Sequence, residues 1–252
     1  MLTLDHLTKR FGEKTLFEDL CLSVTAPVVL WAPSGWGKTT LLRIVMGLEP
    51  PSGGRVRGAG RVAAVFQEDR LCPQLTTEQN IALVLPGAEA QHREALARDL
   101  AELGLDAAAR ALPARQLSGG QKRRAALLRA LWAESDTLVL DEPFTGMDPA
   151  ALERAAALLR ARAAGKPTLL ATHDREAIRL LGWPVAQLSQ KLGEDAVLHD
   201  HPGRGESQRF AVENGIARPD AVLDKAHLPG RKGLAEALPV LGQRKAPPQP
   251  EL

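Results

Sequence analysis

The chain has 252 residues and a net charge of +2, with 25% charged and 44% hydrophobic residues, which is typical of a globular protein. The small net charge and the 4% aromatic content, without tyrosine, argue against a surface that stacks nucleic-acid bases. The N-terminus lacks the hydrophobic block of a signal peptide, and the longest apolar run, residues 20–32, is too short to span a bilayer. We therefore expect a cytosolic protein that reaches a membrane only through a partner.

The first residues predict two strands. Residues 1–7 alternate between apolar and polar side chains, and a second strand is expected over residues 20–24. Phe11 lies in the turn between them, where it either stacks on a purine base or packs beneath the hairpin. The two cysteines, Cys21 and Cys72, have no CxxC spacing and are interpreted as buried thiols in a reducing compartment.

Residues 26–42, APVVLWAPSGWGKTTLL, predict a strand, a phosphate-binding loop and a helix that ends near Gly47. Backbone N–H groups at the start of this helix are expected to converge on phosphate oxygens. Lys38 is expected to reach the β- and γ-phosphates, and the Thr39 hydroxyl to bind Mg²⁺. The predicted nucleotide-binding residues here are Ser34, Gly35, Trp36, Gly37, Lys38, Thr39 and Thr40.

Two positions in this loop are unusual. The first glycine of G-x-x-x-x-G-K-[ST] is replaced by Ala32, which is strained by about 1 kcal/mol if φ is positive and fits if φ is negative. Trp36 is large for such a loop, and we interpret its side chain as solvated and facing away from the nucleotide.

The middle of the chain predicts a helical insertion. A strand over residues 60–66 ends at Gln67, and residues of about 68–135 then show helical rather than strand periodicity. Thr76 or Thr77 is expected to cap a short helix that leads to Ile81.

The sequence LSGGQ, residues 117–121, is the sharpest motif in this insertion. Ser118 is a candidate N-cap, and the two glycines that follow it precede a helix expected over residues 122–132. The backbone N–H groups there provide a second anion-binding helix N-terminus.

A second α/β segment follows the insertion. A buried strand is expected over residues 137–141, a helix over residues 149–163 and another strand over residues 167–172. Asp141 ends the first strand and suits a Mg²⁺ site, and Glu142 is placed to polarise an attacking water. Because ligands bind at the carboxyl ends of parallel strands, the sequence predicts that the following groups converge: the phosphate loop, Gln67, Asp141, Glu142 and His173. After about residue 190 periodicity weakens, and a partly disordered tail of unknown role is expected over residues 191–252.

These motifs, in this order, resemble those of the ATP-binding subunit of an ATP-binding cassette (ABC) transporter. The resemblance covers roughly residues 1–190 and includes the phosphate loop, Gln67, LSGGQ, LVLDEP, Asp148 in GMD and His173 in ATHD. It implies an α/β fold: a P-loop NTPase domain of ABC type over residues 1–190, with an antiparallel β subdomain and a helical subdomain at about 68–135. It also implies ATP and Mg²⁺ as cofactors.

The resemblance assigns roles by position. Glu142 is the catalytic base, His173 contacts the γ-phosphate, and Gln67 contacts Mg²⁺ or water. Thr39, Gln67 and Asp141 form the metal site, and Phe11 matches the aromatic residue that stacks on adenine. Residues that close on ATP held by the opposite subunit of a head-to-tail dimer are Ser118, Gly119, Gly120, Gln121 and Asp148.

The resemblance also implies partners. They are a membrane permease, a second ABC subunit that forms a homodimer in the ATP-bound state, and indirectly a substrate-binding protein; no nucleic acid is expected. The segment VFQEDRLCP, residues 65–73, is similar to the corresponding segment in nitrate, sulfonate and taurine importers. We therefore expect an importer subunit on the cytoplasmic face of the cell membrane. The alternative is a soluble ABC-type ATPase with a non-transport role.

Overall fold

The computed structural model describes residues 1–32, 34–87, 91–188, 197–199, 211–213 and 216–218, which all belong to one compact unit, Met1–Ala221. Most of the expected tail, residues 191–252, lies outside the described residues, so the expectation of partial disorder stays a prediction. No helix in these ranges has both the length and the hydrophobicity that crossing a bilayer requires.

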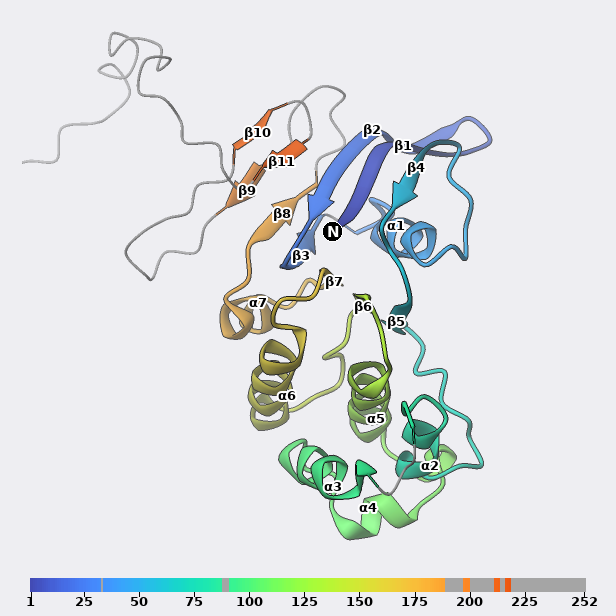
Figure 1. The fold of residues 1–252 in the computed structure, drawn as a ribbon, viewed down its shortest axis with the longest axis vertical. Helices are drawn as coiled ribbons and strands as arrows, with labels where there is room; N and C mark the ends of the chain where they lie inside the picture. Colours follow the sequence, from blue (N-terminus) through green and yellow to red (C-terminus); the bar gives the residue numbers. More distant parts are fainter. Residues whose placement is uncertain (33, 88–90, 189–196, 200–210, 214–215, 219–252) are drawn as a thin grey trace, which may run out of the picture. The chain divides into compact units, whose positions relative to one another are not determined.

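The main sheet has six strands in the order β5-β6-β7-β3-β8-β9 (Figure 1). The first five of these run parallel, and β9 pairs with β8 in the antiparallel direction. The carboxyl ends of the neighbouring strands β5, β6, β7 and β3 therefore lie at one edge of the sheet. The strands are β3 (Pro27–Trp31), β5 (Val62–Val65), β6 (Thr137–Asp141), β7 (Thr168–Ala171), β8 (Val185–Gln187) and β9 (Val197–His199).

A second, antiparallel sheet has the order β2-β1-β4. Its strands are β1 (Leu2–Phe11), β2 (Lys14–Val24) and β4 (Gly53–Arg57), and the short strands β10 (Ala211–Glu213) and β11 (Ile216–Arg218) form a separate hairpin. The first two strands are longer than the sequence predicts, because the residues expected to form a wide turn pair up to Phe11 and Lys14. Register shifts interrupt this pairing where His6 and Asp19 adopt positive φ, at 52° and 54°.

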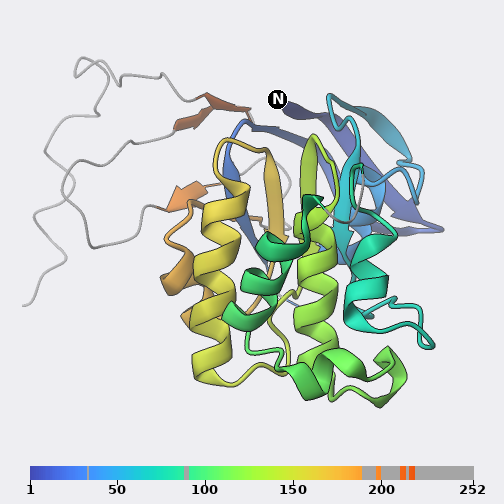
Figure 2. The same cartoon turned by 60° about the horizontal axis from the view of Figure 1, so that its bottom comes forward.

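Helices cover one face of the parallel sheet, and α1 lies on the side of the antiparallel sheet (Figures 1 and 2). The predicted helical segment contains α2 to α5, and α2 is capped by Thr76, whose hydroxyl accepts from the N–H of Gln79. Helix α5 begins at Gly119, three residues before its expected start. The helices are α1 (Lys38–Val45), α2 (Thr77–Ala82), α3 (Arg93–Glu102), α4 (Ala107–Ala111), the 3-10 helix η2 (Ala114–Gln116), α5 (Gly119–Trp132), α6 (Pro149–Ala163) and α7 (Arg175–Leu181).

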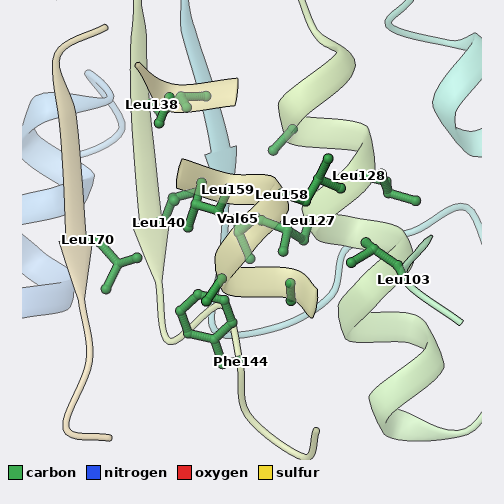
Figure 3. Close-up of a cluster of buried hydrophobic side chains, with 14 of the residues drawn as sticks. Val65, Leu103, Leu127, Leu128, Leu138, Leu140, Phe144, Leu158, Leu159 and Leu170 are labelled. Atoms are coloured by element: carbon green, nitrogen blue, oxygen red, sulfur yellow. The ribbon is translucent and has the colours of Figure 1, made fainter. Parts of the chain in front are cut away.

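The parallel sheet is apolar on both faces, as strands buried between two layers require. In β6, Leu138 and Leu140 belong to the hydrophobic cluster beneath α5 and α6, whereas Val139 between them belongs to the cluster beneath α1. Figure 3 shows the first cluster, in which Phe144 packs with the leucines of the sheet and helices. This two-sided burial fixes where each strand ends, and so fixes the position of the polar residues that follow.

The prediction of two buried thiols is half wrong. Cys21 is buried on β2, but Cys72 is exposed. Cys72 lies in the loop after β5. Its N–H donates to the side-chain oxygen of Asn80, and its carbonyl oxygen accepts from the Asn80 amide, so the backbone is fixed although the thiol is exposed.

Candidate active site

The phosphate loop connects β3 to α1 and contains two left-handed glycines. Gly35 has φ of 79° and Gly37 of 105°, conformations that favour glycine. A Cβ on Gly37 would also lie 3.1 Å from Cδ1 of Leu16. Ala32 does not adopt positive φ, so it carries no backbone strain, and its carbonyl accepts a hydrogen bond of 2.6 Å from Nζ of Lys38. Ala32 therefore meets the backbone requirement of its own position without a glycine.

The interpretation of Trp36 as a solvated side chain is wrong. Its side chain is only 3% exposed and stacks on Phe17 of β2, with ring centroids 5.4 Å apart and an interplanar angle of 15°. A large apolar ring gains more from burial beneath the loop than from exposure to water. Nε1 of the indole has no hydrogen-bond partner among the described residues. Only the main chain of Trp36 is therefore suited to phosphate.

Phe11, at the end of β1, is 51% exposed, which excludes the alternative in which it packs beneath the hairpin. The ammonium group of Lys9 lies 4.6 Å from the centroid of its ring. Lys9 is itself fixed by Glu49, at 2.6 Å, and by the carbonyl oxygen of Pro50, at 2.8 Å. The ring therefore has one face near a fixed cation and remains accessible to a planar ligand.

Asp141 ends strand β6 and is buried. Burial raises the pKa of its carboxyl above the ordinary value; a hydrogen bond with Thr39 and the charges of Lys38 and Arg123 oppose this shift, and the charge of Glu142 adds to it. The structure thus brings a carboxylate from β6 against a hydroxyl from the phosphate loop. Both are oxygen ligands of the kind that Mg²⁺ prefers.

Glu142 follows Asp141 and has φ of 47°, an uncommon value for a residue with a side chain. Its N–H donates to the carbonyl oxygen of Ala171 on β7, at 2.9 Å, which fixes the strained backbone. Oε1 lies 2.7 Å from Nδ1 of His173, and Oε2 accepts a hydrogen bond of 3.0 Å from the Thr172 hydroxyl. The hydrogen bond with Glu142 raises the pKa of His173 above its usual value.

Thr172 is a site residue that the sequence analysis missed. It is buried directly after β7, donates to Glu142, and accepts from the N–H of Asp174 at 3.2 Å. The sequence does place Thr172 between a buried strand and His173. A hydroxyl at that position reaches Glu142 at the end of the neighbouring strand, and this could have predicted its role.

Residues 118–121 form the N-terminus of α5. The Ser118 hydroxyl accepts from the N–H of Gln121 at 3.2 Å, and Oε1 of Gln121 accepts from the N–H of Ser118 at 2.9 Å, which is a capping box. A Cβ on Gly120 would lie 2.6 Å from the carbonyl oxygen of Gly146, whereas one on Gly119 meets open space. The second glycine thus allows contact with the loop that precedes α6, and the first leaves the backbone accessible.

Asp148 caps α6, where Oδ1 accepts from the N–H of Ala151 at 2.9 Å. This hydrogen bond lowers the pKa of its carboxyl, so Asp148 is ionised at neutral pH. The hydrogen bonds described for Asp148 and for residues 118–121 do not join them to the phosphate loop or to Glu142. The structure therefore presents two groups: one at the strand ends and one at the N-termini of α5 and α6.

Comparison with known proteins identifies the family. Residues 19–145 match the family described as ABC transporter. The chain is 42% identical over 215 residues to the aliphatic sulfonates import ATP-binding protein SsuB 1 of Nocardia farcinica, covering 84% of this chain and 81% of that protein. It is 41% identical to SsuB of Delftia acidovorans, covering 82% of this chain and 88% of that protein.

A solved structure gives the same result. The chain is similar to the ATP-binding cassette MJ0796 in a dimeric, post-hydrolysis state bound to ADP and Pi, with a TM-score of 0.66 and 26% identity, covering 75% of this chain and 95% of that one. These matches confirm the predicted P-loop fold of ABC type. The chain therefore belongs to the ABC transporter family, as one of its ATP-binding and ATP-hydrolysing subunits.

Proposed function

We propose that this subunit energises the import of an aliphatic sulfonate, or a closely related anion, through a separate membrane permease. The observation that supports catalysis is the fixed carboxylate of Glu142, held at the edge of the sheet where the phosphate loop also begins. The observation that supports the substrate class is the identity to relatives whose names specify aliphatic sulfonates import. The similar segment at residues 65–73 points in the same direction.

In the proposed reaction, main-chain N–H groups of the phosphate loop and Lys38 bind the β- and γ-phosphates of ATP. Thr39, Asp141 and Gln67 would hold Mg²⁺, and the donor set fits because a hydroxyl, a carboxylate and an amide oxygen are all hard ligands. When bound, Mg²⁺ neutralises negative charge on the phosphates. Phe11 stacks on the adenine ring.

Glu142 acts as the general base that accepts a proton from the attacking water, and His173 contacts the γ-phosphate. Thr172 and the backbone hydrogen bond to Ala171 keep the Glu142 carboxylate in place as the proton is transferred. A positioned general base typically contributes about 10²–10⁴ in rate.

The N-termini of α5 and α6 are proposed to complete the site of a second copy. Residues 118–121 expose a helix N-terminus, and the open space around Gly119 permits close approach of a phosphate group. Asp148 would lie at the same contact. The dimeric state of the similar cassette supports a head-to-tail dimer that forms around ATP.

The remaining partners are a permease, contacted directly, and a substrate-binding protein that delivers the substrate to it. We place the subunit on the cytoplasmic face of the cell membrane, where ATP is available. Residues 1–190 are proposed as the ATPase domain, with residues of about 68–135 as its helical subdomain.

The deciding experiment is an affinity pull-down of tagged protein from detergent-solubilised native membranes, followed by mass spectrometry. We expect a polytopic permease, and we expect the complex in proteoliposomes, with its binding protein, to hydrolyse ATP faster when an alkanesulfonate is added. Recovery of soluble or nucleic-acid-bound partners alone would contradict the transport role. A permease complex that responds to nitrate but not to sulfonates would contradict the substrate class alone.

A further inference from the structure

Arg123, on the second turn of α5, is a buried cation whose contacts reach into the loop after β5. Its side chain is 7% exposed. Nη1 donates to the carbonyl oxygen of Phe66 at 2.5 Å, and Nη2 donates to the carbonyl oxygen of Gln67. Nε lies 3.4 Å from Oδ1 of Asp69. All three nitrogens of one guanidinium group therefore face the short segment that contains Gln67.

Arg129, six residues further along α5, extends this contact. Its Nη1 donates to the carbonyl oxygen of Arg70 at 2.7 Å, and its Nη2 to that of Asp69 at 3.4 Å. The loop is also strained and covered here, because Arg70 has φ of 46° and its guanidinium lies 4.0 Å from the ring centroid of Phe66. We call Arg123 and Arg129 the arginine clamp.

The clamp binds main-chain oxygens, so it fixes the path of the loop without occupying the side chain of Gln67, which remains exposed. A planar guanidinium holds two acceptors in a set geometry, which an ammonium group does not do. Arg123 thus joins α5 to the loop that contains Gln67.

We propose that Arg123 is a positioning residue that fastens the Gln67 loop to α5 and so holds Gln67 in place for its role at the ATP site. Arg123 belongs to the same helix whose N-terminus is formed by residues 118–121. This inference rests on the proposed role of Gln67 in holding Mg²⁺ and water.

The test uses the full chain with the substitutions Arg123→Met and Arg123→Lys. Arg123→Met keeps an unbranched apolar stem but removes the guanidinium group that donates to both carbonyl oxygens. Arg123→Lys keeps the charge but loses the planar arrangement of donors. Arg162→Met is the matched control, because it removes an arginine from the buried Asp99 on α3 without touching the Gln67 loop. Steady-state ATP hydrolysis is measured against both ATP and Mg²⁺, together with thermal unfolding.

We expect both Arg123 variants to lower kcat by roughly tenfold to a hundredfold and to raise the Mg²⁺ concentration needed for half-maximal rate, with KM for ATP changed by less than about threefold. Arg162→Met is expected to lower Tm with kcat nearly unchanged. The proposal is overturned if Arg123→Met lowers only Tm, or if Arg123→Lys restores the wild-type rate, because charge alone would then suffice.

Gln67→Ala separates failure of this inference from failure of the proposed function. If Gln67→Ala is impaired and Arg123→Met is not, the clamp is merely structural and the proposed role of Gln67 stands. If Gln67→Ala has full activity, the role proposed for Gln67 is wrong and the inference fails with it.

Discussion

Oε1 of Glu142 lies 2.7 Å from Nδ1 of His173, while the Thr172 hydroxyl donates to the second carboxylate oxygen. Both oxygens are therefore engaged by residues that follow β7, although Glu142 itself follows β6. The base and its orienting groups come from neighbouring strands, so their geometry is set by the register of the sheet.

Substitution Glu142→Gln should remove turnover, because an amide accepts no proton from water at neutral pH. We expect the rate of ATP hydrolysis to fall by about 10²–10⁴, with ATP binding retained and an ATP-held dimer accumulating in size-exclusion chromatography. Glu176→Gln, on the exposed surface of α7, is the control. Full activity of Glu142→Gln would refute its assignment as the base.

His173 should titrate above its ordinary pKa of 6.5, because its hydrogen bond with Glu142 favours the charged ring. NMR titration of the imidazole should show a lower pKa in Glu142→Gln. Since the folded-state pKa is raised, the pair stabilises the fold fully below pH 6.5 and loses this effect as pH rises through the raised value. The ring is 81% exposed, so we expect the effect on stability to be small. An identical pKa in both proteins would contradict the pairing.

Ala32→Gly should leave nucleotide binding nearly unchanged. The Ala32 backbone lacks positive φ, and Lys38 uses its carbonyl oxygen, which glycine also provides. We expect the affinity for a fluorescent ATP analogue to change by less than tenfold, about 1.4 kcal/mol. Lys38→Ala serves as the reference for lost affinity. A larger gain for Ala32→Gly would show that the alanine strains the loop.

Trp36 should contribute to stability through its ring and not through its N–H group. Trp36→Ala is expected to lower the free energy of unfolding by about 3–5 kcal/mol, measured by urea denaturation. Trp36→Phe retains stacking with Phe17 and loses no hydrogen bond to a described residue, so it should cost less than half as much. Equal losses for the two variants would reveal an acceptor for the indole.

The two glycines of LSGGQ should differ sharply. Gly119→Ala meets open space and is expected to raise the free energy of unfolding by about 0.4–1 kcal/mol, since alanine favours a helix. It should nevertheless slow hydrolysis if this helix end approaches the ATP of a second copy. Gly120→Ala meets the carbonyl oxygen of Gly146 and is expected to cost about 1–3 kcal/mol. Unchanged hydrolysis in Gly119→Ala would argue against the proposed dimer contact.

Local patterns were sufficient to predict much of this site. Thr76 and Ser118 are caps because their side chains bond to the backbone three residues on, which depends only on nearby sequence. The end of β6 at Asp141 followed from an apolar run that stops, whereas β5 ends at Val65, two residues before Gln67. Long-range packing was not predictable: Trp36 is buried only because Phe17 of β2 lies beneath it. In the sequence, Arg123 is one of several cations on α5. Its role is visible only in the fold, which places the carbonyl oxygens of Phe66 and Gln67 beside it.

The strand order has a consequence for synthesis of the chain. β3 pairs with β7 and β8, and β5 pairs with β6, so neither β3 nor β5 has a partner in the main sheet before residue 137 is made. By then all three strands of the antiparallel sheet, β1, β2 and β4, have been synthesised. Strands β6 and β7 must enter between β5 and β3, which left the ribosome earlier, closing long loops at an entropic cost. The phosphate loop is therefore synthesised early but gains its catalytic neighbours late.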